Sequence, residues 1–158
     1  MSQLNNAFKA SVEASIAGLR DLAVILKKEQ QALGGNNVQA LEEVVEEKQQ
    51  LLAALHHSVQ AREQIQRQAQ LATGLAGGEV FIREHFSPAE ISSSWKTLVK
   101  LSKEVDALNS QNGKLAHACE RTTRQALGIL TGRSQEQDTY EAGSAVNASL
   151  GGYSLGKC

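Results

Sequence analysis

The sequence predicts an all-α protein: an antiparallel up-down-up bundle of three long helices with coiled-coil-like packing, followed by a flexible C-terminal tail. Aromatic residues make up only 4% of the 158 residues and there is a single proline, Pro88, whereas sheets favour aromatic and β-branched residues. The commonest residue types are instead good helix formers, such as Ala, Leu, Gln and Glu. Apolar residues also recur three, four or seven positions apart over three long segments, which is typical of one face of a helix.

The first segment predicts a helix over residues 3–33. We expect it to end at Gly34-Gly35, because glycine adopts the left-handed cap conformation without strain. Asn36 or Asn37 can then cap the next helix. The apolar stripe of this first helix comprises Leu4, Phe8, Val12, Ile16, Leu19, Leu22, Leu26 and Leu33.

The second segment predicts a helix over residues 37–72, with Lys48 among the charged side chains beside its apolar stripe. Its stripe comprises Leu41, Val45, Leu52, Leu55 and Val59. The connection from Thr73 to Phe86 is expected to be irregular because it contains three glycines, and it ends in the apolar "EVFIREHF" at residues 79–86. Two interpretations of this connection stay open, a short helical turn that covers the end of the bundle and a docking patch.

The third segment predicts the longest helix, over residues 88–130. Ser87 is the expected cap, Pro88 suits the first helical position, and Glu90 completes a capping box. Two heptad rows follow along this helix. The first comprises Ile91, Leu98, Val105, Asn112, Cys119 and Ala126, and the second comprises Leu101, Leu108, Leu115, Thr122 and Ile129.

The dipeptide Asn112-Gly113 lies inside this third segment, although Asn-Gly is a frequent turn sequence. Both heptad rows cross it without losing phase, which favours one continuous helix over the alternative of a turn. Asn112 falls on the apolar seam, where an asparagine can fix helix register or partner choice. Gly113 would allow another backbone to approach closely.

The chain is thus divided into a helical bundle, residues 1–131, and a flexible tail, residues 132–158, which is rich in glycine and serine and lacks apolar periodicity. The third helix is expected to outrun the second by about 12 Å. Apolar residues on its last turns would then lack an internal partner, and such residues usually mark association. These residues are Ala126, Leu127, Ile129 and Leu130.

Charge and motifs exclude several functions. The formal net charge of −1 provides no long-range attraction to nucleic acid or to anionic membranes. The first 18 residues contain no secretory signal pattern and two cysteines make no disulfide framework, so a cytoplasmic location is expected. No Glu-x-x-His pair and no glycine-rich phosphate loop occurs, so we expect no catalytic, cofactor or metal site and no small-molecule substrate. A phosphotransfer bundle using His57 is the enzymatic alternative, but the sequence after His57 lacks the usual lysine and glycine.

The third segment contains the motifs "LNSQNGKL" at residues 108–115 and "RQALGIL" at residues 124–130, and the second segment contains "EEKQQLLAAL" at residues 46–55. In these motifs the chain resembles the FlgN family of flagellar export chaperones. The resemblance covers most of residues 1–143. The family's Tyr-Gly-x-x-Gly element is matched only in part, because Tyr140 is followed by Glu141.

The resemblance implies a non-enzymatic cytoplasmic chaperone without cofactors. Such a protein binds flagellar hook-associated (hook–filament junction) subunits, prevents their premature association, and delivers them to the export gate of the flagellar type III apparatus. By position, Tyr140 would contact the export gate membrane protein. The surface for the exported subunit would comprise Leu115, Ala126, Leu127, Ile129 and Leu130. The alternative is a helical scaffold without cargo that self-associates, as a homodimer, through the third helix.

Overall fold

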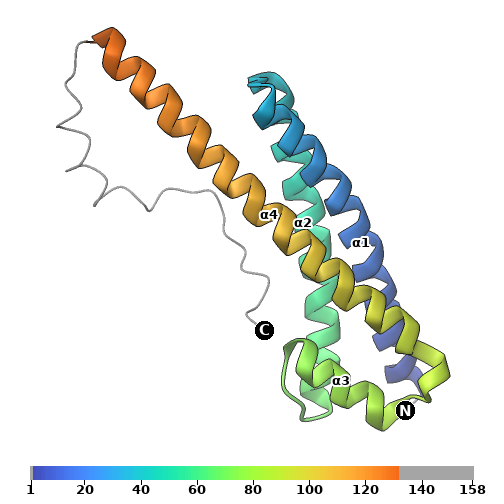
Figure 1. The fold of residues 1–158 in the computed structure, drawn as a ribbon. Coiled ribbons are helices and arrows are strands. Elements are labelled where there is room, and N and C mark those ends of the chain that lie inside the picture. The colour runs from blue at the N-terminus through green and yellow to red at the C-terminus, as the bar shows by residue number, and fades with distance from the viewer. Residues whose placement is uncertain (1, 132–158) are drawn as a thin grey trace.

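The computed structural model describes residues 2–131 and shows, within them, four helices and no strand. The all-α prediction is therefore confirmed, whereas the prediction of three helices is wrong for the described residues, because the connection expected to be irregular forms a helix of its own. The predicted tail, residues 132–158, lies outside the described residues. The helices are α1 (Ser2–Gly34), α2 (Val38–Gln68), α3 (Gly74–His85) and α4 (Pro88–Thr131) (Figure 1).

Helix α1 is the central element of the fold. It packs along α2 on one side and along α4 on the other, whereas α2 and α4 touch each other far less. Figure 1 shows α4 crossing the α1–α2 pair and running in the same direction as α1. The three long helices therefore do not pack as equivalent members of a closed three-helix bundle.

The turn after α1 differs from the prediction in one respect. Gly34 is the last helical residue, and the left-handed conformation is taken by Asn36 with φ 50° and not by either glycine. Asparagine tolerates this region because its short side chain can hydrogen-bond locally. Asn37 then caps α2 as expected, since its side chain accepts a hydrogen bond of 3.1 Å from the backbone N–H of Ala40.

Helix α2 ends at Gln68 and not at the expected Ala72. Gln70 adopts φ 59°, which breaks the helical path. The backbone N–H of Leu71 donates to the carbonyl of Gln66 at 2.9 Å, so the last carbonyls of the helix are satisfied as in a Schellman-type end.

Helix α3 covers the end of the core next to the start of α1, which supports the packing interpretation of this segment. Phe81 is 1% exposed and stacks on Phe8 with ring centroids 4.5 Å apart. Phe8 in turn lies 6.1 Å from the ring of Trp95 on α4. Because α1, α3 and α4 each supply one of these rings, the aromatic cluster ties the three helices together.

Two adjacent glycines of α3 are required by this packing. A Cβ atom on Gly78 would overlap the indole ring of Trp95, and one on Gly77 would overlap the carbonyl of Ala72. Both positions are buried. The glycines therefore serve close helix packing, even though glycine lowers helix propensity.

The start of α4 forms one half of the predicted capping box, because the backbone N–H of Glu90 donates to the carbonyl of Ser87 and not to its hydroxyl. The backbone N–H and the hydroxyl of Ser87 both donate to Oε2 of Glu90, at 2.8 and 2.7 Å. The hydroxyl contact, followed by the backbone N–H, lowers the pKa of Glu90 below its usual value. Pro88 occupies the first helical position, where its missing N–H costs nothing.

Substitution by alanine distinguishes a glycine that close packing requires from a glycine that is exposed on a helix. We expect Gly78→Ala to lower the free energy of unfolding by about 1–3 kcal/mol, because the added methyl overlaps the Trp95 ring. Gly113→Ala is the matched control: no atom lies within 4 Å of its added Cβ, so helix propensity should raise the stability by about 1 kcal/mol. Urea denaturation of both variants measures the difference. A stabilising Gly78→Ala would contradict the packing role of α3.

Candidate functional site

Helix α4 passes through Asn112-Gly113 without interruption, which confirms the continuous helix and excludes the turn. Side chains of its first heptad row are fully buried up to Asn112, and their burial then falls toward the C-terminus. Ile91, Leu98 and Val105 are each 1% exposed and Asn112 is 2% exposed. Cys119 is partly exposed and Ala126 is exposed. The seam that holds α4 on the core therefore ends between the fourth and the sixth members of this row.

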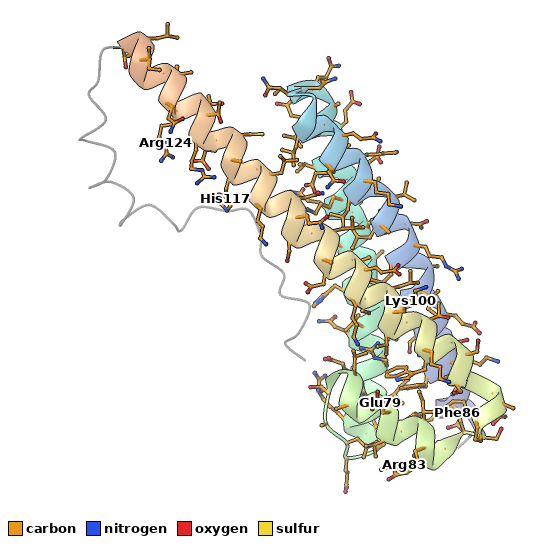
Figure 2. All side chains as sticks on the ribbon, viewed as in Figure 1. Glu79, Arg83, Phe86, Lys100, His117 and Arg124 are labelled. Carbon is orange, nitrogen blue, oxygen red and sulfur yellow. The ribbon has the colours of Figure 1, made fainter. Side chains whose placement is uncertain are left out.

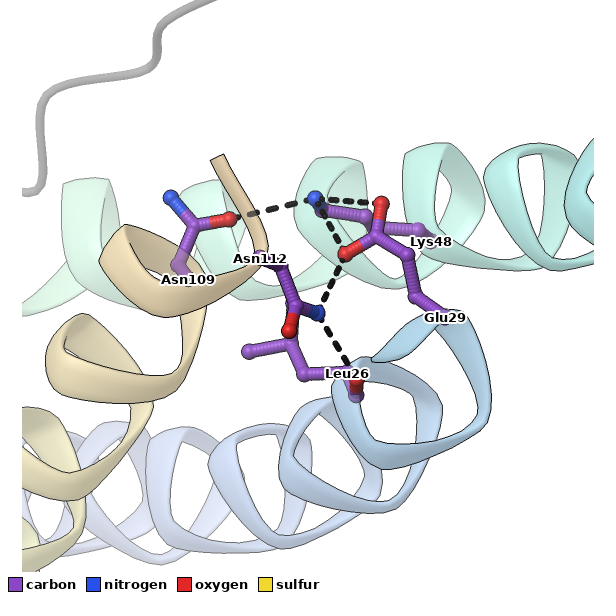
Figure 3. Close-up of polar contacts among 5 residues, drawn as sticks. All are labelled: Leu26, Glu29, Lys48, Asn109 and Asn112. Atoms are coloured by element: carbon purple, nitrogen blue, oxygen red, sulfur yellow. Dashed lines mark hydrogen bonds and ion pairs between the residues drawn. The ribbon is translucent and has the colours of Figure 1, made fainter. Parts of the chain in front are cut away.

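Asn112 is the centre of a polar network that joins three helices (Figure 3). Its amide nitrogen donates to the carbonyl of Leu26 at 2.7 Å and to Oε2 of Glu29 at 2.8 Å. The ammonium of Lys48, on α2, donates to both oxygens of Glu29 at 3.1 and 3.2 Å. The same ammonium reaches the side-chain oxygen of Asn109, at 3.1 Å. Such a network can fix the register predicted for Asn112, because sliding α4 along α1 breaks the bonds of Asn112 and Asn109. Only the contact between Lys48 and Glu29 would remain.

Sequence reasoning missed two members of this network. Lys48 was expected only to flank a stripe, but it lies between α1 and α4. Glu29 received no role, although it is only 8% exposed. The available signal was its spacing: Glu29 lies three residues after Leu26 and four before Leu33, at a position of the apolar stripe where a charge needs a partner.

Beyond this network, α4 projects from the rest of the molecule. The last polar contact is a hydrogen bond of 3.7 Å from the thiol of Cys119 to the carbonyl of Leu33, near the end of α1. Within residues 2–131, no hydrogen bond or ion pair joins α4 after Cys119 to another helix. Residues 120–131 extend about 18 Å, and Figure 1 shows this orange end leading away from α1 and α2.

The structure brings the predicted subunit-binding residues together on this projecting end, which we call the α4 tip (residues 115–131). Leu115 is partly exposed at its base. Ala126 is exposed, Leu127 is 55% exposed, and Ile129 and Leu130 are each 81% exposed. Large side chains with this exposure on a helix without a neighbour form a surface suited to association.

The structure does not support a contact for two other residues that the sequence singled out, Tyr140 and Gly113. Tyr140, the expected contact of the export gate, lies outside the described residues. Gly113 is exposed, and no atom lies within 4 Å of a Cβ built on it. The close backbone approach expected at Gly113 is therefore not made by any segment of the described chain.

The other side of the α4 tip, together with Lys114 just before it, is basic. Lys114, His117, Arg121 and Arg124 recur three or four residues apart and are exposed, so they share one face of the helix. Glu120 forms an ion pair of 2.7 Å with Arg124 and lies 3.8 Å from His117. Figure 2 shows His117 and Arg124 pointing away from α1 and α2. The tip is thus amphipathic, with one apolar and one positively charged side.

The described residues hold no candidate metal site. Among residues 2–131, no group of three or more His, Cys, Asp or Glu side chains could hold a metal ion. No helix in that part of the chain is both long enough and apolar enough for a membrane crossing.

Comparisons with known proteins give one family match and one match to a solved structure of similar fold. The model of the FlgN protein family matches residues 1–147. A crystal structure of a flagella synthesis protein FlgN from Pseudomonas aeruginosa is similar in fold, with a TM-score of 0.59 and 24% identity. That similarity covers 77% of this chain and 93% of the other. No curated protein matches the chain.

The Asn112 network predicts opposite results for two nearby asparagines. Asn112→Asp removes both donated hydrogen bonds and places a second carboxylate against Glu29, so we expect a loss of about 3 kcal/mol or more in stability. Asn109→Asp is the control, because its oxygen already accepts from Lys48 and an added negative charge there should leave the stability unchanged or slightly higher. Urea denaturation near neutral pH measures both, and equal losses would show that Asn112 has no special role.

Proposed function

The chain belongs to the FlgN family, and from that premise we propose that it is a cytoplasmic, non-enzymatic chaperone of flagellar type III export. It binds hook-associated, hook–filament junction subunits. It prevents their association before export and delivers them to the export gate. Family membership supports the role in flagellar assembly, and the α4 tip supports the mode of binding.

The observation that carries this proposal is the exposed apolar face of the α4 tip. Ile129 and Leu130 are each 81% exposed on a helix end that, after Cys119, forms no hydrogen bond or ion pair with another helix of the described residues. A subunit that assembles through amphipathic helices must have its apolar stripe covered to stay monomeric. A second amphipathic helix laid along the α4 tip would cover both stripes, as in other helix-in-groove complexes.

Delivery is assigned to Tyr140 within the C-terminal tail. The tail's composition, rich in glycine and serine, is typical of segments that become ordered only on binding. Such segments bind with modest affinity because ordering opposes binding. Modest affinity suits a gate contact, since the chaperone has to leave once the subunit is exported.

A self-associating scaffold is the second candidate, because a homodimer through α4 would bury the same apolar residues. The two candidates differ in what the tip binds. If the tip binds the exported subunit, purified protein mixed with a hook-associated subunit forms a complex that contains both proteins. If the tip self-associates, only homodimers form. Light scattering coupled to size-exclusion chromatography distinguishes them.

We expect Leu127→Asp to weaken binding of a hook-associated subunit about tenfold or more, because a charge replaces a side chain that the complex buries. Leu127 is 55% exposed in the free protein, so the fold should keep its melting temperature. Val24→Asp, at a 56% exposed valine on α1, is the matched control and should bind normally. Isothermal titration calorimetry gives the affinities. Unfolding of the Leu127 variant would instead make this residue part of the core.

Tyr140→Ala should separate delivery from binding. We expect the variant to keep its affinity for the exported subunit but to lower the amount secreted by flagellated cells, since the tyrosine is proposed to contact the gate. Calorimetry and immunoblots of culture supernatants measure the two effects. An equal loss of subunit affinity would assign Tyr140 to the subunit surface.

A further inference from the structure

Two contacts fix the antiparallel register of α2 against α4. The guanidinium of Arg62 lies 5.6 Å from the ring centre of Trp95, and the ammonium of Lys48 donates to Asn109 at 3.1 Å. The two contacts are fourteen residues apart on α2 and fourteen residues apart on α4. One side of α2, repeating every heptad, therefore faces α4.

The same side continues toward the start of α2, where α4 no longer covers it. Leu41 lies one heptad before Lys48, and the same register would place it opposite Ala116 on α4. Val38 and Val45 flank Leu41 on the helix surface at spacings of three and four residues. Val38 is 64% exposed, and Leu41 and Val45 are partly exposed. We call these three residues the α2 patch.

Helix α4 leaves α2 earlier than it leaves α1. Its last polar contact with α2 in the described residues is at Asn109, whereas Cys119 still reaches Leu33 at the end of α1. Figure 1 shows the start of α2 and the end of α4 diverging from each other. The α2 patch belongs to the diverging part of α2, and Leu115, at the base of the α4 tip, belongs to the diverging part of α4. A single helix inserted there can touch both apolar surfaces.

The charges beside the α2 patch define the partner further. Glu42, Glu43 and Glu46 are exposed, and within residues 2–131 their side chains form no ion pair or hydrogen bond. The neighbouring Glu47 is different, because it pairs with Lys28 at 3.6 Å. Three unpaired carboxylates on two turns attract a positively charged segment and repel an acidic one.

We propose that the α2 patch is a second contact surface for the exported subunit, which rests on the function proposed above. The occupant is one amphipathic helix of that subunit. Its apolar stripe lies between the α2 patch and the α4 tip, and Lys or Arg residues follow the edge of the stripe that faces Glu42 and Glu46. The continuity of the two apolar surfaces and the unpaired acidic side chains together favour this occupant.

The test measures binding of a purified full-length hook-associated subunit by calorimetry. We expect Val38→Asp to weaken binding about tenfold, as estimated from the burial of one valine, while Val24→Asp binds as the wild type. Glu42→Lys/Glu46→Lys should weaken binding severalfold at low salt and much less at high salt, because salt screens exposed charges. Glu13→Lys/Glu79→Lys, also at exposed glutamates, is the charge-matched control.

Each result bears on the proposal. The proposal is supported if Val38→Asp and the Glu42/Glu46 variant both bind the subunit more weakly while both control variants bind it as the wild type does. Normal binding by these two variants, together with weak binding by Leu127→Asp, overturns the second surface and leaves the proposed function intact. Absence of binding by the wild type defeats both. A wild-type homodimer that Val38→Asp dissociates without changing subunit affinity would assign the α2 patch to a second copy of the chain and also overturn the proposal.

Discussion

The position of α4 on α1 depends on one buried polar contact, the two hydrogen bonds that Asn112 donates to Leu26 and Glu29. The α4 residues that precede Asn112 in the buried heptad row, Ile91, Leu98 and Val105, are aliphatic, and such side chains tolerate several alignments. A shift of α4 by one heptad would place Val105 or Cys119 beside Glu29, which would keep its bonds to Lys48. The amide nitrogen of Asn112 would lose both of its acceptors. Because an unsatisfied buried polar group costs about 1–3 kcal/mol, the asparagine selects one alignment among several that would bury similar apolar area.

That alignment determines which residues are left uncovered. Helices α1 and α4 run in the same direction, and the contacts Leu26–Asn112 and Leu33–Cys119 advance by one heptad on each helix. Helix α1 ends at Gly34 whereas α4 continues to Thr131. The final turns of α4 therefore extend past the last residue of α1 that could pack against them. The apolar side chains of the tip are exposed because of helix lengths and register, and no conformational change is needed to reveal them.

The sequence predicted the features that local interactions determine. The capping residues Asn37 and Ser87 and the heptad phase across Asn112 act within a few turns of one helix, so each was readable without the fold. Helix α3 was predicted only as a short helical turn, one of two interpretations of its segment, because Gly77 and Gly78 oppose helix formation locally and Gly78 is required by the distant Trp95 ring. Lys48 could not be placed either. Its role depends on which side of α2 faces α4, and that is a property of the assembled helices.

The central claim is that the α4 tip is uncovered in the free protein and is covered by the exported subunit. Hydrogen–deuterium exchange read by mass spectrometry, with and without a purified hook-associated subunit, tests it most directly. The account predicts that amides of residues 120–131 exchange much faster than those of residues 98–112 in the free protein and become strongly protected in the complex. Equal protection of both segments in the free protein, or no change at residues 120–131 on subunit binding, would contradict it.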